Sequence, residues 1–157
     1  MKYRVIGQDP QTRREVSVLS LGAMLFGTAT DEPTSFAILD RYVEAGGTFV
    51  DTSDNYAYWI NGTQGGESER LLGRWRRSRG IGDEVVVATK VGARPLAPGT
   101  GFLDNAEGLS AKVIRESATF ASLASIFKAA LWRWLICRRR STIIPSRGIS
   151  RSTPARS

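Results

Sequence analysis

Apolar segments separated by polar turns predict how the chain begins. The segments YRVIG, residues 3–7, and REVSVLSLG, residues 14–22, lie on either side of the turn-forming sequence QDPQT, an arrangement that predicts an N-terminal β-hairpin. The second arm continues as the mostly apolar segment VLSLGAMLFG, residues 18–27. A run of this kind is typical of a strand that is buried on both faces in a parallel sheet.

Two helices with a strand between them are predicted next. The first helix begins near Asp31 and Pro33 and ends at Gly46 and Gly47. The segment TFVDTS is a short buried strand, and the segment ESERLLGRWRRSR, residues 67–79, is the second helix. The apolar face of this helix consists of Leu71, Leu72 and Trp75, and its five arginines are expected on a solvated face.

A third strand and a third helix complete the pattern. The segment DEVVVATKVG, residues 83–92, is a strand that ends in Lys90, and Ser110 can cap a helix over AKVIRES. The resulting order βαβαβα implies parallel strands joined by crossover helices, so the predicted fold class is α/β.

Composition and charge indicate a globular domain with a basic C-terminal segment. The 157 residues are 41% hydrophobic and 24% charged. The net charge is +7, but residues 1–116 hold 14 basic and all 15 acidic residues (14 − 15 = −1), and the other 22 − 14 = 8 basic residues follow Glu116. The body of the chain therefore has no bias towards a polyanion, and no specific nucleic-acid partner is expected. The single cysteine, Cys137, and an N-terminus without a signal-peptide core indicate a cytoplasmic location.

Two of the predicted strands end in opposite charges, Asp51 and Lys90. Neighbouring parallel strands lie about 4.8 Å apart, and α/β folds build their sites at the carboxyl ends of strands, so an ion pair is expected at this edge. Tyr56 follows in the next loop. An ordinary phenol, with a pKa near ~10, is a weak acid at neutral pH, but an adjacent ammonium stabilises its phenolate. The three residues therefore form a candidate proton donor, although Asp51 and Lys90 could equally just cap the sheet.

These residues lie in segments that resemble the aldo-keto reductases, NADPH-dependent enzymes built on a (β/α)8 TIM barrel. The matching segments cover residues 1–117 in family order and at family spacing: YRVIG with SVLSLGAMLFG, EAGGTFVDTSDNY, GGESERLLGRW, VVVATKVG and GLSAKVIRESA. The resemblance implies an incomplete (β/α)8 TIM barrel, consisting of about the first three βα units preceded by the β-hairpin.

The resemblance also implies a reaction, the reduction of an aldehyde or ketone to an alcohol, with NADPH as cofactor and a small carbonyl compound as substrate. In this reaction Tyr56 would be the general acid, Lys90 the cation that makes it a stronger acid, and Asp51 the partner that orients Lys90.

Further residues match positions near the cofactor or the substrate. Gly22, Ala23 and Met24, together with Asp51, match positions that lie near the nicotinamide in the family. Two aromatic residues after the candidate acid either line an apolar substrate pocket or pack the loop against the rim: Tyr58 and Trp59.

The chain also departs from the family pattern. It contains no histidine, whereas the family's catalytic set includes one at the end of the fourth strand, and it is much shorter than a family member. Residues 118–157 contain no acid and are rich in Arg, Ser and Ala, which we interpret as an unrelated tail, disordered or irregularly helical, from a frameshifted or broken gene.

Two functions are consistent with these features. One is a truncated reductase with weak or no activity, and the other is a non-catalytic fragment or interaction protein whose basic tail contacts a membrane surface. Residues 119–137 are about long enough to span a bilayer, but Lys128 and Arg133 make insertion unfavourable. An open sheet edge also predicts self-association.

Overall fold

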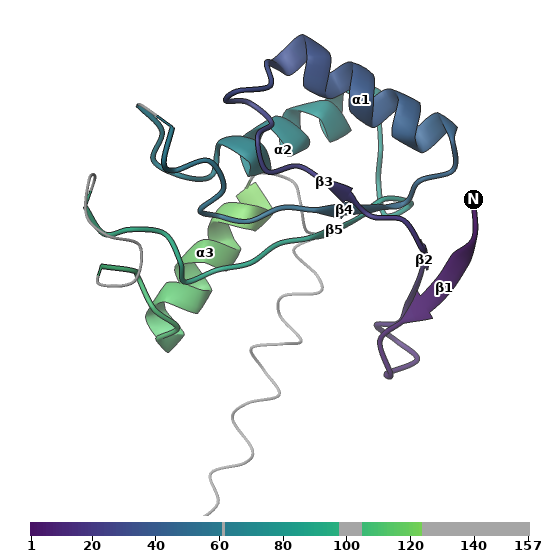
Figure 1. Ribbon diagram of the computed structural model, residues 1–157. Coiled ribbons are helices and arrows are strands. Elements are labelled where there is room, and N and C mark those ends of the chain that lie inside the picture. Colours follow the sequence, from purple (N-terminus) through teal and green to yellow (C-terminus); the bar gives the residue numbers. More distant parts are fainter. Residues whose placement is uncertain (61, 98–104, 124–157) are drawn as a thin grey trace, which may run out of the picture.

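The computed structural model describes residues 1–60, 62–97 and 105–123, which form a short hairpin and a parallel sheet covered by helices (Figure 1). The elements, in chain order, are β1 (Tyr3–Ile6), β2 (Arg14–Ser17), β3 (Leu21–Gly22), α1 (Glu32–Glu44), β4 (Phe49–Asp51), α2 (Glu67–Arg79), β5 (Val86–Ala88) and α3 (Ala111–Leu123).

The N-terminal hairpin forms as predicted. Strands β1 and β2 pair antiparallel, with Tyr3 opposite Ser17 and Ile6 opposite Arg14. The hydroxyl of Tyr42, on α1, fastens the hairpin to the sheet because it lies 2.9 Å from Ser17 Oγ and donates to the carbonyl oxygen of Phe49 at 2.8 Å.

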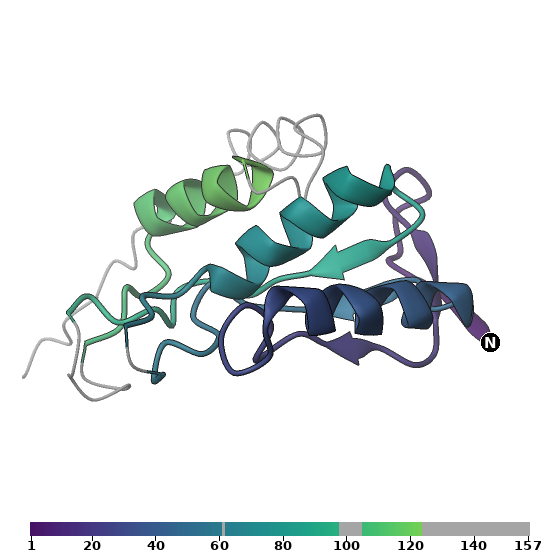
Figure 2. The same cartoon turned by 90° about the horizontal axis from the view of Figure 1, so that it is seen from above.

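Strands β3, β4 and β5 form a parallel sheet in that order, which confirms the predicted α/β class with its first βα units. Gly22 is in register with Asp51, and Asp51 with Ala88, so the carboxyl ends of the three strands lie side by side. The crossover helices α1 and α2 both lie on one face of this sheet (Figure 1), and seen from above α2 lies between α1 and α3 (Figure 2).

The prediction of a long doubly buried strand over residues 18–27 is wrong. Only Leu21 and Gly22 are in strand β3, which pairs with β4 alone among the described residues. The chain then turns, because the N–H of Phe26 bonds back to the carbonyl of Ala23 and that of Thr30 to the carbonyl of Leu25. The apolar pattern was therefore misleading, since it continued through a turn.

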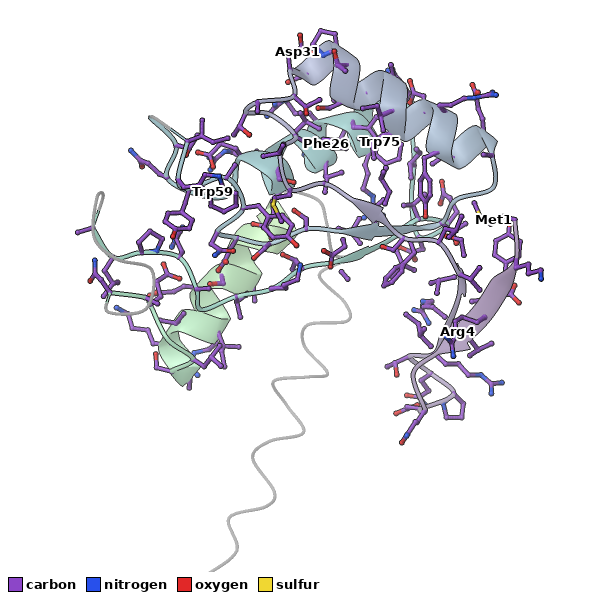
Figure 3. All side chains as sticks on the ribbon, in the orientation of Figure 1. Met1, Arg4, Phe26, Asp31, Trp59 and Trp75 are labelled. Atoms are coloured by element: carbon purple, nitrogen blue, oxygen red, sulfur yellow. The ribbon has the colours of Figure 1, made fainter. Side chains whose placement is uncertain are left out.

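The core lies between the sheet and the helices. Residues with no exposed surface include Leu39 of α1, Val50 of β4, and Leu71, Leu72 and Trp75 of α2, which confirms the predicted apolar face of α2. Figure 3 shows Trp75 between α1 and the sheet. Burial of such side chains stabilises a fold by about 1.5–3 kcal/mol each.

The arginines of α2 differ from the solvated face that was expected. Arg74 binds Glu32 of α1 through its Nε at 3.0 Å, and Arg79 binds Asp40 of α1 through its Nη2 at 2.8 Å. Arg76 is buried, donates to the carbonyl oxygens of the loop that follows α2, and has its pKa lowered by burial. The arginine cluster is thus in part a contact between helices, which sequence periodicity alone does not distinguish from a wet face.

The start of α1 is fixed by Asp31, as predicted. Its Oδ1 accepts the backbone N–H of Thr34 at 2.9 Å, and this hydrogen bond lowers the pKa of Asp31. We expect Asp31→Ala to lower the melting temperature by a few degrees, because the first turn of α1 loses its cap. Because the pKa is lowered, the contribution is complete above about pH 4 and is lost as the pH falls further. Thermal melts should show a larger wild-type advantage at pH 7 than at pH 3, and Glu44→Ala is the control.

The helix α3 begins after Ser110, whose Oγ accepts the N–H of Val113 at 3.3 Å, as predicted. It extends past residue 117 to Leu123. The expectations for the tail concern residues 118–157, and all but the first six of these lie outside the described residues. Within the ranges that the structure describes, no helix has the length and apolar character needed to cross a membrane.

Candidate active site

Asp51, Tyr56 and Lys90 meet at the carboxyl ends of β4 and β5. Lys90 Nζ donates to both carboxylate oxygens of Asp51, at 3.0 Å and 2.8 Å, and to Tyr56 Oη at 2.5 Å. The Tyr56 hydroxyl donates to Asp51 Oδ2 at 2.8 Å. These three side chains were expected at one edge of the sheet, and the structure brings all three together.

The strands deliver these side chains by register and alternation. Val50 lies buried under the helices, so its neighbour Asp51 projects from the opposite face of β4. The pairing of the two strands continues past their formal ends, because Thr52 N–H bonds to the carbonyl of Ala88 and Asp54 N–H to the carbonyl of Lys90. Lys90 is therefore held beside Asp51 by its backbone as well as by its side chain.

The ammonium of Lys90 is held in its charged form. Partial burial lowers the pKa of Lys90, but the hydrogen bonds with Asp51 and Tyr56, together with the negative charge of Asp51, outweigh burial and raise the pKa above its ordinary value. The side chains of the pair are 52% and 37% exposed, so water screens the ion pair and its contribution to stability is about 0–1 kcal/mol. A role in capping the sheet would therefore add little stability, although three polar side chains converge there.

The predicted cofactor stretch divides between core and surface. Gly22 is exposed and lies in register with Asp51, and a Cβ added to it would meet no atom of the described residues within 4 Å. Met24 is 44% exposed, whereas Ala23 is fully buried and packs into the core. The space over Gly22 beside Asp51 is therefore open, whereas Ala23 belongs to the core on the other face of the strand.

The two aromatic residues of the β4–α2 loop contact each other. The rings of Tyr58 and Trp59 lie edge to face, with centroids 5.4 Å apart, and Trp59 is 53% exposed. Figure 3 shows Trp59 on the side of the molecule away from the core residue Trp75. Both interpretations of this pair, pocket lining and loop packing, remain consistent with its position.

Sequence reasoning missed a buried polar network behind the site. Asp54 Oδ2 accepts the N–H of Gly92 at 3.3 Å, and burial raises the pKa of Asp54. Ser53 Oγ donates to Asn55 Oδ1 at 2.7 Å, and the Asn55 amide donates to the carbonyl of Ala93 at 3.4 Å. The loop after Asp51 is thereby tied to the loop after Lys90. Its Ser, Asp and Asn residues looked like ordinary turn residues, so the sequence carried no distinct signal for this role.

The parallel strands carry an acid, a phenol and an ammonium at their carboxyl ends, and the fold is that of part of an oxidoreductase barrel. The Aldo/keto reductase family model matches residues 18–124, and the chain belongs to this family.

Named relatives and solved structures agree with this assignment. The chain is 40% identical over 132 residues to the norsolorinic acid reductase stcV of Emericella nidulans, covering 79% of this chain and 32% of that one. It is 41% identical over 97 residues to norsolorinic acid reductase B of Dothistroma septosporum, covering 57% and 22%. The holo form of the aldo-keto reductase AKR11C1 from Bacillus halodurans superposes with a TM-score of 0.59 at 27% identity, covering 79% of this chain and 36% of that one. The chain thus spans less than a third of the length of either norsolorinic acid reductase.

Proposed function

We propose that this chain carries the proton-donating half of a carbonyl reductase that converts an aldehyde or ketone to an alcohol with NADPH. The observation that supports this most directly is the position of Tyr56 Oη, 2.5 Å from the ammonium of Lys90 and 2.8 Å from the carboxylate of Asp51. Membership of the Aldo/keto reductase family supports an oxidoreductase, and two relatives are named as reductases.

In this mechanism Tyr56 is the general acid. Its hydroxyl turns from Asp51 towards the carbonyl oxygen of the substrate and transfers its proton as the new alcohol forms. The ammonium of Lys90 stabilises the negative charge left on Tyr56 Oη, and Asp51 keeps that ammonium in place through two hydrogen bonds. Water then returns a proton to Tyr56.

The cofactor contributes the other half of the reaction. NADPH, when bound, supplies the hydride that forms the new C–H bond at the carbonyl carbon. On this side of the site Gly22 leaves the space in which the nicotinamide would lie, Met24 offers an exposed side chain beside it, and Asp51 borders it. We propose that the turnover of this chain, whose sequence contains no histidine, depends on Tyr56, Lys90 and Asp51.

An NADPH titration of the full chain tests this proposal. We expect saturable binding, followed by cofactor fluorescence, and slow NADPH consumption when benzaldehyde is added. Gly22→Leu should weaken binding by roughly tenfold because its side chain fills the space beside Asp51, whereas Gly22→Ala, which adds one methyl group, should change it little.

Two results would count against the proposal. If NADPH does not bind the wild-type chain, the reductase function is wrong and the non-catalytic alternative takes its place. If Gly22→Leu binds as tightly as the wild type, the cofactor does not lie at the end of β3. Circular dichroism of both variants checks that the fold is retained.

A further inference from the structure

The first turn of α2 is hydrogen-bonded to the ends of all three strands of the parallel sheet. Ser68 Oγ donates to the carbonyl oxygen of Ala23 at 2.7 Å and lies 2.8 Å from Thr52 Oγ1. Glu69 Oε1 accepts the hydroxyl of Thr89 at 2.6 Å. Two adjacent side chains of one helix thus reach the residues that directly follow β3, β4 and β5.

Each of these partners is the chain neighbour of a candidate site residue. Ala23 follows Gly22, Thr52 follows Asp51, and Thr89 precedes Lys90. Because side chains alternate between faces along an extended chain, Thr52 and Thr89 point towards α2 while Asp51 and Lys90 point the other way. The contacts of α2 therefore hold the strand ends from behind the site.

The position of Glu69 is not explained by the helix itself. A Glu at the third position of a helix commonly turns back to accept the backbone N–H of the cap residue. Here the cap residue is Gly66, and no side-chain hydrogen bond caps the helix. Glu69 instead binds Thr89 at the end of the sheet. Its neighbour Glu67 is the residue that turns back, accepting the N–H of Gln64 at 3.0 Å.

The position of Glu69 is also costly. Its side chain is only 1% exposed, and its second oxygen, Oε2, has no hydrogen-bond partner among the described residues. Burial raises the pKa of Glu69; the hydroxyl of Thr89 and the charges of Arg70 and Arg94 oppose this, and the charge of Asp54 adds to it. A buried and half-satisfied carboxyl is worse for stability than an apolar side chain of the same size, so stability alone does not account for it.

We propose that Glu69 is a positioning residue for Lys90: through the hydroxyl of Thr89 it fixes the end of β5, and so sets the contacts of the Lys90 ammonium with Asp51 and Tyr56. Ser68 likewise fixes the ends of β3 and β4, through its hydrogen bonds with Ala23 and Thr52. The contacts of Lys90 span 2.5–3.0 Å, so a shift of about 1 Å at Thr89 is enough to break them. The catalytic consequence rests on the proposed reductase function, whereas the positioning itself does not.

The test measures the Lys90 amine directly in the full chain. Each protein is acetylated with limiting acetic anhydride over a range of pH, and mass spectrometry compares the peptide that contains Lys90 with the peptide that contains the exposed Lys112. In Thr89→Val, which keeps the shape of the side chain and removes only the hydroxyl, Lys90 should react about tenfold faster relative to Lys112. Its reactivity profile should also move to lower pH, because the contacts that raise the pKa of Lys90 are loosened.

Matched variants separate positioning from a general loss of structure. Thr89→Ser keeps the hydroxyl and should behave as the wild type. Glu69→Gln keeps an oxygen that can accept from Thr89 and should preserve the slow reaction of Lys90, whereas Glu69→Ala should match Thr89→Val. An unchanged circular dichroism spectrum checks that the fold persists, and Lys112, whose side chain is 79% exposed, is the reference amine in every variant.

The possible results decide the question without an active enzyme. If Lys90 in Thr89→Val reacts as in the wild type, or if Glu69→Gln behaves like Glu69→Ala, Glu69 does not position Lys90. If the wild type binds no NADPH but Lys90 reacts faster in Thr89→Val than in the wild type, Glu69 positions Lys90 and the proposed reductase function is wrong. Where turnover is measurable, Thr89→Val should lower kcat and leave the KM for benzaldehyde nearly unchanged, because the Thr89 hydroxyl is directed to Glu69 of α2.

Discussion

Tyr56→Phe should lower the rate of NADPH-dependent carbonyl reduction by roughly 10²–10⁴-fold, because it removes the hydroxyl that donates the proton to the forming alkoxide. The fold should persist, since Tyr56 is half-buried and the change removes one hydroxyl that joins Asp51 and Lys90. The measurement is kcat for benzaldehyde at saturating NADPH. Cofactor binding should be nearly unchanged.

A matched control for this prediction lies in β1, outside the site. Tyr3→Phe removes a hydroxyl of the same kind, which donates to the carbonyl of Gly46 at 3.0 Å, and it should leave the rate within about threefold of the wild type. Lys90→Met should follow Tyr56→Phe, since the phenolate then loses its counter-charge. Equal activity of the wild type and Tyr56→Phe would remove the proposed general acid.

Trp75→Ala should destabilise the fold by about 3–5 kcal/mol, the largest single stability effect we expect. Trp75 is fully buried in the core between the sheet and the helices. Its indole N–H also donates to Asp40 Oδ1 at 2.8 Å, so the substitution removes a hydrogen bond and leaves a cavity. Urea unfolding, followed by circular dichroism, measures the change from the shift of the midpoint at constant slope.

Trp59→Ala is the corresponding control, because it deletes the same side chain from an exposed loop position. We expect a loss below about 1 kcal/mol. Equal shifts of the urea midpoint for the two variants would mean that the core is not organised around α2. A broad transition in the wild type would show that the chain does not unfold in two states, and the comparison would then rest on the midpoints alone.

Local signals were sufficient to predict α1, α2 and the meeting of Asp51 and Lys90 at one edge of the sheet. Asp31 and the glycine pair bounded α1 nearly to the residue, and the expected range 67–79 is the observed extent of α2. The site followed from one rule, since charged residues that end neighbouring parallel strands meet at the same edge. Asp51 and Lys90 obey it because Asp51 is in register with Ala88, two residues before Lys90.

Contacts made across the fold were beyond the reach of sequence patterns. The residues that follow Gly22 are also apolar. The hydrophobic pattern therefore did not show that β3 ends at Gly22 or that Ala23 is buried in the core. Arg76 and Glu69 belong to charged runs that resemble a wet helix face, yet both are buried by neighbours from other parts of the chain. Burial of a charged residue depends on tertiary packing, which helical periodicity does not encode.

The bonds from α2 to the strand ends have a consequence for how the site assembles. The side chains of Asp51, Tyr56 and Lys90, and the first turn of α2, all lie between residues 51 and 90. In the hydrogen bonds described above, Ala23 is the partner from earlier in the chain. Joining Asp51 to Lys90 closes a single loop of modest length, for which the entropic penalty is small and grows slowly with chain length. Pairing of parallel strands across such a loop is non-local and therefore slow, since the loop must close before the contacts can form. Every residue of this proton-donating corner has nevertheless been synthesised once the chain reaches Lys90.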